Sequence, residues 1–160
     1  ENAHCPQLLA VGESSDAHHM SSPHPEGQGA VIAMQTALRY AGLKPDQIDY
    51  LNLHATATRI NDQVEARAVQ QVFEQVLCSG TKGITGHTLG AAGALETIIT
   101  LLALEHQFIP GTANLSETDS DCVCNVQKTP QFDQPLRIAM SNSFGFGGNN
   151  ASVIVARGAG

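Results

Sequence analysis

The stretch RIAMSNSFGFGGNNASVIVA, residues 137–156, decides most about the fold. Two apolar runs, 137–144 and 151–156, flank a turn at 145–150 in which three of the six residues are glycine. This pattern predicts two strands joined as a hairpin. The glycines also let the backbone of the turn approach a ligand closely and present free N–H groups to it.

Upstream of this hairpin, strand-like and helix-like patterns alternate. Strands are predicted at residues 8–11, 48–53 and 78–81, the last being a short strand or a turn. A polar, turn-rich segment at 13–29 follows the first of them. Helices are predicted at 30–41, from Asn61 to about Val76, and from about 88 to 106. We therefore expect residues 1–160 to form one layered α/β domain with a mixed sheet, a buried central helix and a C-terminal β-hairpin.

Local signals mark where these helices begin and end. Gly42 is expected to stop the first helix, and Asn61 is expected to cap the second. In the third, Glu96 is the only acidic or basic side chain between residues 84 and 104, but glycines, threonines and His87 make this region too polar to span a membrane. A helix that is apolar on most sides indicates burial between layers, and no membrane partner is expected.

The composition excludes several functions. The net charge is −7 and no basic run is present, so nucleic acid is not an expected partner. The histidines at 18, 19 and 24 are close in sequence, but prolines interrupt the segment and the helical HExxH spacing is missing, so no metal site is predicted. The cysteines at 5, 78, 122 and 124 form no CxxC pair, and no signal peptide is visible. We interpret them as reduced thiols in a cytoplasmic protein.

Three segments could carry chemistry. His54 ends a predicted strand, where open α/β sheets place their ligand crevices. Lys82 and His87 lie five residues apart just before a predicted helix, and Phe146 lies in the glycine-rich turn. Each also has an ordinary interpretation: a structural histidine, a surface lysine and a plain hairpin turn.

In order and spacing, the three segments resemble the C-terminal half of the elongating β-ketoacyl-acyl-carrier-protein synthases, which have the thiolase fold. The resemblance covers nearly the whole chain. It includes the segments 14–23, 61–66, 81–93 and 142–149, which are similar to the opening segment, a helix start, a lysine–glycine–histidine motif and the terminal glycine loop of the family.

The resemblance implies a decarboxylative condensation of an acyl thioester with malonyl-carrier protein, in fatty acid or polyketide elongation. His54 and His87 would stabilise the enolate, and Lys82 would fix His87 and hold the charge balance, together with Glu65. Phe146 would supply a backbone oxyanion donor and, through its ring, a gate to the acyl pocket; a rigid hairpin with Phe144 and Phe146 in the core is the alternative. Substrate contacts would come from Thr56, Thr58 and Phe144. No cofactor is implied beyond the phosphopantetheine of the acyl carrier protein.

Two departures from the family pattern stand out. Ala55 and Ala57 replace the usual glycines beside Thr56, and none of the four cysteines lies in a nucleophile motif. The nucleophile is expected in an N-terminal half that this chain lacks, so the isolated chain is expected to be inactive. Expected partners are that half, acyl carrier protein and a second copy in a homodimer.

Three other functions stay open from the sequence. One is a non-catalytic partner of the same fold, such as a chain-length factor. The others are a thiolase and an unrelated binding domain.

Overall fold

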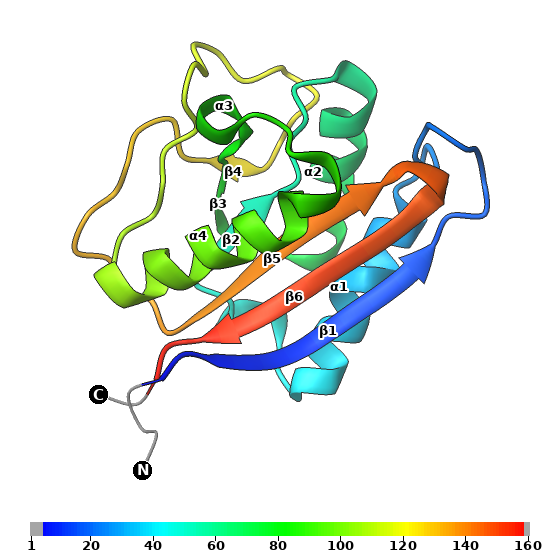
Figure 1. Cartoon of the computed structure of the whole chain (residues 1–160). Coiled ribbons are helices and arrows are strands. Elements are labelled where there is room, and N and C mark those ends of the chain that lie inside the picture. Colours follow the sequence, from blue (N-terminus) through cyan, green and yellow to red (C-terminus); the bar gives the residue numbers. More distant parts are fainter. Residues whose placement is uncertain (1–4, 159–160) are drawn as a thin grey trace.

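The computed structural model describes residues 5–158, which build one mixed six-stranded sheet (Figure 1). Its strand order is β1-β6-β5-β2-β3-β4. The strands are β1 (Gln7–Ser15), β2 (Tyr50–Leu53), β3 (Leu77–Gly80), β4 (Asn125–Val126), β5 (Ile138–Gly145) and β6 (Asn149–Ala156).

The predicted C-terminal hairpin is confirmed. Strands β5 and β6 pair antiparallel up to Gly145 opposite Asn149, and the short 3₁₀ turn η3 (Phe146–Gly148) joins them. Gly147 and Gly148 adopt φ angles of 79° and 75°, which side-chain-bearing residues rarely reach. Strand β1 pairs antiparallel with the other edge of β6 along its whole length. It is therefore longer than predicted, because Ser14 and Ser15, expected in a turn, continue this pairing.

The other half of the sheet is parallel. Strand β2 pairs in parallel with both β5 and β3, and β3 pairs in parallel with β4. The chain passes from β2 to β3 through a helix, as a parallel crossover requires. The predicted mixed sheet is therefore confirmed, and His54 follows the carboxyl end of β2, a central strand.

Helices cover both faces of the sheet (Figure 1). On one face, α1 (Gln28–Ala41) and α2 (Arg59–Val72) pack with Leu51, Met140 and Ile154. On the other, α4 (Ala92–His106) packs with Tyr50, Ala139 and Val155. The alternation of side chains along β2, β5 and β6 thus builds two separate cores. Short turns complete the chain: η1 (Pro45–Gln47), α3 (Lys82–Thr85) and η2 (Leu89–Ala91).

Both ends of α2 differ from the sequence prediction. Helix α2 begins at Arg59 with Thr58 at its N-cap, so the prediction that Asn61 caps it was wrong. The Asn61 amide instead donates to Asp62 Oδ1 within the first turn. The helix ends at Val72, and Val76 joins the same core from the following turn, which explains why the four-residue apolar spacing extends past the helix. Gly42 does end α1, at a φ of 66°.

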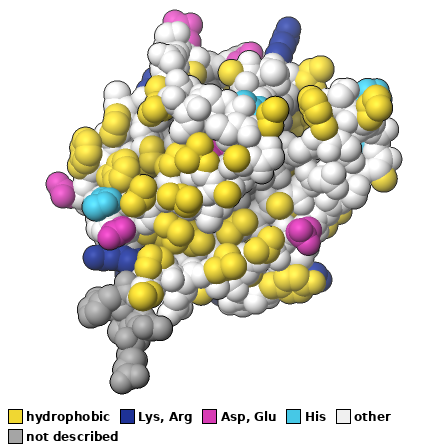
Figure 2. All heavy atoms as spheres, in the orientation of Figure 1, with side chains coloured by type: hydrophobic (Ala, Val, Ile, Leu, Met, Phe, Trp, Pro, Cys, Tyr) yellow, Lys and Arg dark blue, Asp and Glu magenta, His cyan; other side chains and the backbone are white. Residues whose placement is uncertain are grey.

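Helix α4 is covered on one side only by the residues described. Thr100, Ala103 and Leu104 are buried, whereas Ile98 and Leu102 are exposed. Figure 2 shows the resulting band of apolar side chains over α4 and the strands beside it. By length and composition alone, Leu89–His106 could also cross a membrane, a test that core helices of soluble proteins pass as well.

Candidate active site

The backbone around His54 is fastened by a buried carboxylate. The N–H groups of His54 and Ala55 donate to the two carboxylate oxygens of Glu65 on α2, each over 2.8 Å. Burial raises the pKa of Glu65 to about 7, although both N–H donors lower it. In the next residues the chain turns through left-handed conformations, with φ angles of 35° at Ala55 and 59° at Ala57.

The His54 imidazole is neutral and its tautomer is set by Lys82. Its side chain is buried, with 5% of the residue exposed, and Lys82 Nζ lies 3.3 Å from Nδ1. Burial, the Lys82 ammonium and the neighbouring His87 lower the pKa of His54 to about 3. Because an ammonium can only donate, Nδ1 accepts and the ring proton resides on Nε2.

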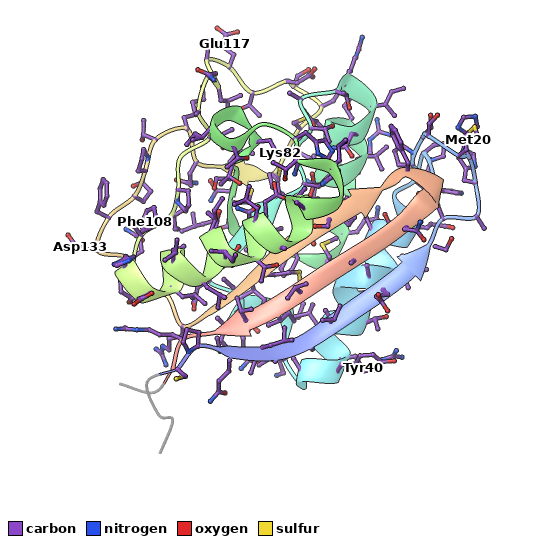
Figure 3. All side chains as sticks on the ribbon, viewed as in Figure 1. Met20, Tyr40, Lys82, Phe108, Glu117 and Asp133 are labelled. Carbon is purple, nitrogen blue, oxygen red and sulfur yellow. The ribbon has the colours of Figure 1, made fainter. Side chains whose placement is uncertain are left out.

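Lys82 has a different partner from the one the resemblance implied. Its ammonium donates to the His54 carbonyl oxygen and to Glu96 Oε1, in an ion pair whose side chains are 6% and 1% exposed. It therefore lies beside His54 and Glu96, whereas it was expected to fix His87 together with Glu65. The surface-lysine interpretation is also wrong, because the Lys82 side chain is buried; Figure 3 labels it at the start of α3, near α4.

His87 faces His54 from the segment before α4. The ring centroids are 5.4 Å apart and the planes are nearly perpendicular, at 86°. The N–H of Leu89 donates to His87 Nδ1 over 3.1 Å, so this ring also carries its proton on Nε2. The two imidazoles thus have the same tautomer, each fixed by a donor at Nδ1.

The glycine turn lies against the segment that follows β1. The Gly147 N–H donates to the Met20 carbonyl oxygen, and the Asp16 N–H donates to the Gly148 carbonyl oxygen. Figure 3 places Met20 at the edge of the molecule beside this turn. Phe144 is partly buried, with its ring centroid 5.9 Å from that of His54. Phe146 is 80% exposed, so the interpretation that puts both rings in the hairpin core is wrong.

The remaining predicted residues lie at the surface or form no site. Thr56 and Thr58 are joined by a hydroxyl–hydroxyl contact of 2.8 Å on the exposed loop before α2. His18 and His24 pack edge to face with centroids 5.1 Å apart. Within residues 5–158, no group of three or more metal-ligating side chains is arranged to hold an ion.

Sequence reasoning missed two polar residues of the site. Glu96 neutralises Lys82, and the available signal was that Glu96 is the only acidic or basic side chain between residues 83 and 104. The Asn142 amide donates to Glu65 Oε1 over 3.4 Å from β5. No local pattern distinguishes Asn142 from the other polar residues of its strand.

The sheet is half parallel and half antiparallel, it lies between helical layers, and two imidazoles face each other beside it. Together these features define a domain of the thiolase-like fold. The chain belongs to the β-ketoacyl synthase family: the family model described as "Beta-ketoacyl synthase, C-terminal domain" matches residues 7–116.

Relatives support this assignment. The chain is 48% identical to the mitochondrial 3-oxoacyl-[acyl-carrier-protein] synthase of Arabidopsis thaliana, over 94% of this chain and 34% of that protein. It is 41% identical to 3-oxoacyl-[acyl-carrier-protein] synthase 2 of Coxiella burnetii, over 94% of this chain and 37% of that protein. The chain thus spans little more than a third of the curated relatives it matches.

Solved structures agree with the fold. The ketosynthase ApeO of Xenorhabdus doucetiae, solved with its chain length factor ApeC, is matched with a TM-score of 0.89 and 49% identity, over 95% of this chain and 39% of that one. A β-ketoacyl synthase of Burkholderia phymatum is matched with a TM-score of 0.89 and 35% identity, over 95% of this chain and 37% of that one.

Proposed function

We propose that this chain is the C-terminal half of a β-ketoacyl-acyl-carrier-protein synthase, which condenses an acyl thioester with malonyl-carrier protein and releases CO₂. One observation carries the proposal: His54 and His87 face each other, and each has its Nδ1 occupied by a donor and its Nε2 left to donate. Family membership limits the class of reaction, whereas the two imidazole rings supply the hydrogen-bond donors that the reaction needs.

The two N–H donors suit decarboxylation of the extender thioester. Loss of CO₂ leaves negative charge on the thioester oxygen, and Nε2–H groups aimed at that oxygen stabilise the enolate. A ring with a pKa of about 3 stays neutral at physiological pH, so His54 acts as a hydrogen-bond donor that keeps its proton. The enolate carbon then attacks the acyl thioester held on a cysteine in the N-terminal half.

Lys82 and Glu96 act through His54. The Lys82 ammonium occupies Nδ1 and the carbonyl oxygen of His54, so it fixes both the tautomer and the ring orientation. Glu96 neutralises that ammonium inside the domain. Glu65 holds the backbone that carries the ring.

The glycine turn and the threonine loop would contact the acyl and pantetheine groups. The Phe146 N–H would form an oxyanion hole together with the cysteine N–H of the other half. The exposed Phe146 ring would gate the acyl pocket, with Phe144 lining it beside His54. The hydroxyl groups of Thr56 and Thr58 would bind phosphopantetheine.

The proposed partners follow from the exposed surfaces. The apolar outer side of α4, with Ile98 and Leu102, is the surface that the N-terminal half would cover. Acyl carrier protein would deliver both substrates, and the complete enzyme would form a homodimer. We propose a cytoplasmic location; the Arabidopsis thaliana relative is named as mitochondrial.

The test is a comparison of His54→Ala and His87→Ala in the complete enzyme. Each should slow CO₂ release about a hundredfold, the typical effect of removing one oxyanion donor, while at least one should leave cysteine acylation much less affected. His106→Ala, an exposed histidine at the end of α4, is the matched control. Normal CO₂ release in both variants would refute the assignment.

A second measurement addresses the missing half. The 160-residue chain alone should form no 3-ketoacyl product from acyl- and malonyl-carrier protein, and product from it would contradict the proposal that the nucleophile lies elsewhere. If the complete protein acylates no cysteine, a chain-length-factor-like partner becomes the better assignment.

A further inference from the structure

Two cysteines from distant parts of the sequence meet at the far edge of the sheet. Cys78 lies on β3 with its side chain fully buried. In the parallel pairing of β3 with β4, Cys78 lies opposite Val126, and Cys124 precedes Val126 by two residues. Cys78 is buried in the core formed with α1 and α2, and the partly buried Cys124 packs against the same core.

The segment that carries Cys124 is fixed to β3 by backbone hydrogen bonds. The Gln127 N–H donates to the Cys78 carbonyl oxygen over 2.7 Å, and the Val126 N–H donates to the Cys124 carbonyl oxygen over 2.9 Å. The second bond bends the chain tightly at Asn125 and holds Cys124 close to β3.

Cys124 also faces a pocket. A cavity of about 360 Å³ lies between the first turns of α2, the ends of β2 and β3, and residues 112–126. Cys122 and Cys124 line it, together with apolar side chains such as Leu53, Leu115 and Val126. His54, Lys82 and His87 do not line it, although Ala55 and Glu65, which adjoin His54, do. Acidic side chains, among them Glu117 on the loop seen at the top of Figure 3, and a single arginine contribute to its wall.

The three thiols at this edge of the sheet differ in reactivity. Contact with the Cys78 thiol lowers the pKa of Cys124. The same contact and burial raise the pKa of Cys78, and burial with nearby carboxylates raises the pKa of Cys122 to about 11. Cys124 lines the cavity whereas Cys78 is fully buried, so Cys124 is the thiol that a molecule in the cavity reaches, and its lowered pKa favours the thiolate that attacks.

We propose that Cys78 and Cys124 form a dithiol site that reacts with small, uncharged disulfides entering through this cavity. The Cys124 thiolate attacks one sulfur of the disulfide, forms a mixed disulfide and expels one thiolate. The Cys78 sulfur then attacks Cys124 Sγ, its proton passes to the departing group, and a second thiol leaves. The two protein thiols are oxidised to one disulfide and the small disulfide is reduced to two thiols. This site does not depend on the proposed condensing activity.

The experiment uses the full-length protein and 2-hydroxyethyl disulfide as the probe. Free thiols are then alkylated, and the Cys78, Cys122, Cys124 and Cys5 peptides are mapped by mass spectrometry. We expect a Cys78–Cys124 disulfide in the native protein and in Cys122→Ser, with exposed Cys5 forming only a mixed disulfide. Phenylarsine oxide, which bridges paired thiols, should protect the same two cysteines from alkylation.

Two variants test the order of attack. Cys78→Ala should retain a persistent mixed disulfide on Cys124, formed several-fold more slowly. Cys124→Ser should leave Cys78 unreactive while the protein stays folded by circular dichroism. A Cys122–Cys124 disulfide, an unmodified Cys124 in the native protein, or rapid reaction of Cys78 in Cys124→Ser would each overturn the proposal.

Discussion

Replacing Ala57 by glycine should stabilise this protein. Ala57 adopts a φ of 59° on the exposed loop that follows His54. The left-handed conformation costs a residue with a Cβ about 1–2 kcal/mol, and glycine avoids this cost. The glycine loses more chain entropy on folding, about 0.4–1 kcal/mol. The difference predicts a gain of about 0.5–1 kcal/mol in the free energy of unfolding, because the strain exceeds the entropy term.

Urea unfolding of Ala57→Gly against the parent protein measures this gain, together with a rise in Tm of about 1–4 °C. The matched control is Ala113→Gly, in a loop position whose φ is not positive. It should lose stability, because the entropy term and the lost contacts of the half-buried Cβ act there without any relief of strain. Equal losses in the two variants would refute the argument that Ala57 is strained.

Three other predictions follow from the site. The pKa of His54 falls from 6.5 to about 3 on folding, so the unfolded chain binds more protons between these pH values. Stability should therefore fall as the pH drops through this window, by up to about 1.4 kcal/mol per pH unit. His54→Gln should remove this component of the pH dependence of stability. Glu96→Gln should lower the free energy of unfolding by about 3 kcal/mol, because it leaves the Lys82 charge uncompensated. In urea unfolding, the double variant with Lys82→Met should recover part of this lost stability. Purely additive losses would argue against an energetic coupling between Lys82 and Glu96. Phe146→Ala should change stability by no more than about 0.5 kcal/mol, because the ring is exposed. The proposed gate role predicts altered acyl loading in the complete enzyme, and unchanged loading would argue against that role.

The sequence predicted the features that short stretches encode. The glycine turn between two apolar runs identified the hairpin, and Gly42 identified the end of α1. The two-residue strand β4 was missed, because its extended shape depends on pairing with β3, whose residues lie far away in the sequence. The start of α2 was misplaced because it depends on the geometry of the loop after His54. No side chain makes a capping hydrogen bond at this end of the helix, so the sequence carried no capping signal for it.

The sequence identified side chains that lie together in the structure, but it did not predict all of their contacts. His54, Lys82 and His87 were identified by motif, and the structure brings all three together. The pairing of Lys82 with Glu96 could not be read from spacing, because the two residues lie in different elements and meet only when α4 packs on the sheet. A hydrogen bond between distant residues becomes predictable only once the topology is known.

In the loop after β2 the carboxylate of Glu65 binds main chain alone, since it accepts the N–H groups of His54 and Ala55 and touches neither side chain through these bonds. A substitution at Ala55 therefore leaves this clamp chemically unchanged, provided that the new residue accepts the local backbone conformation. Over evolutionary time, the loop behind the imidazole can exchange side chains, and thereby reshape the surface presented to a substrate, without releasing the histidine that it carries.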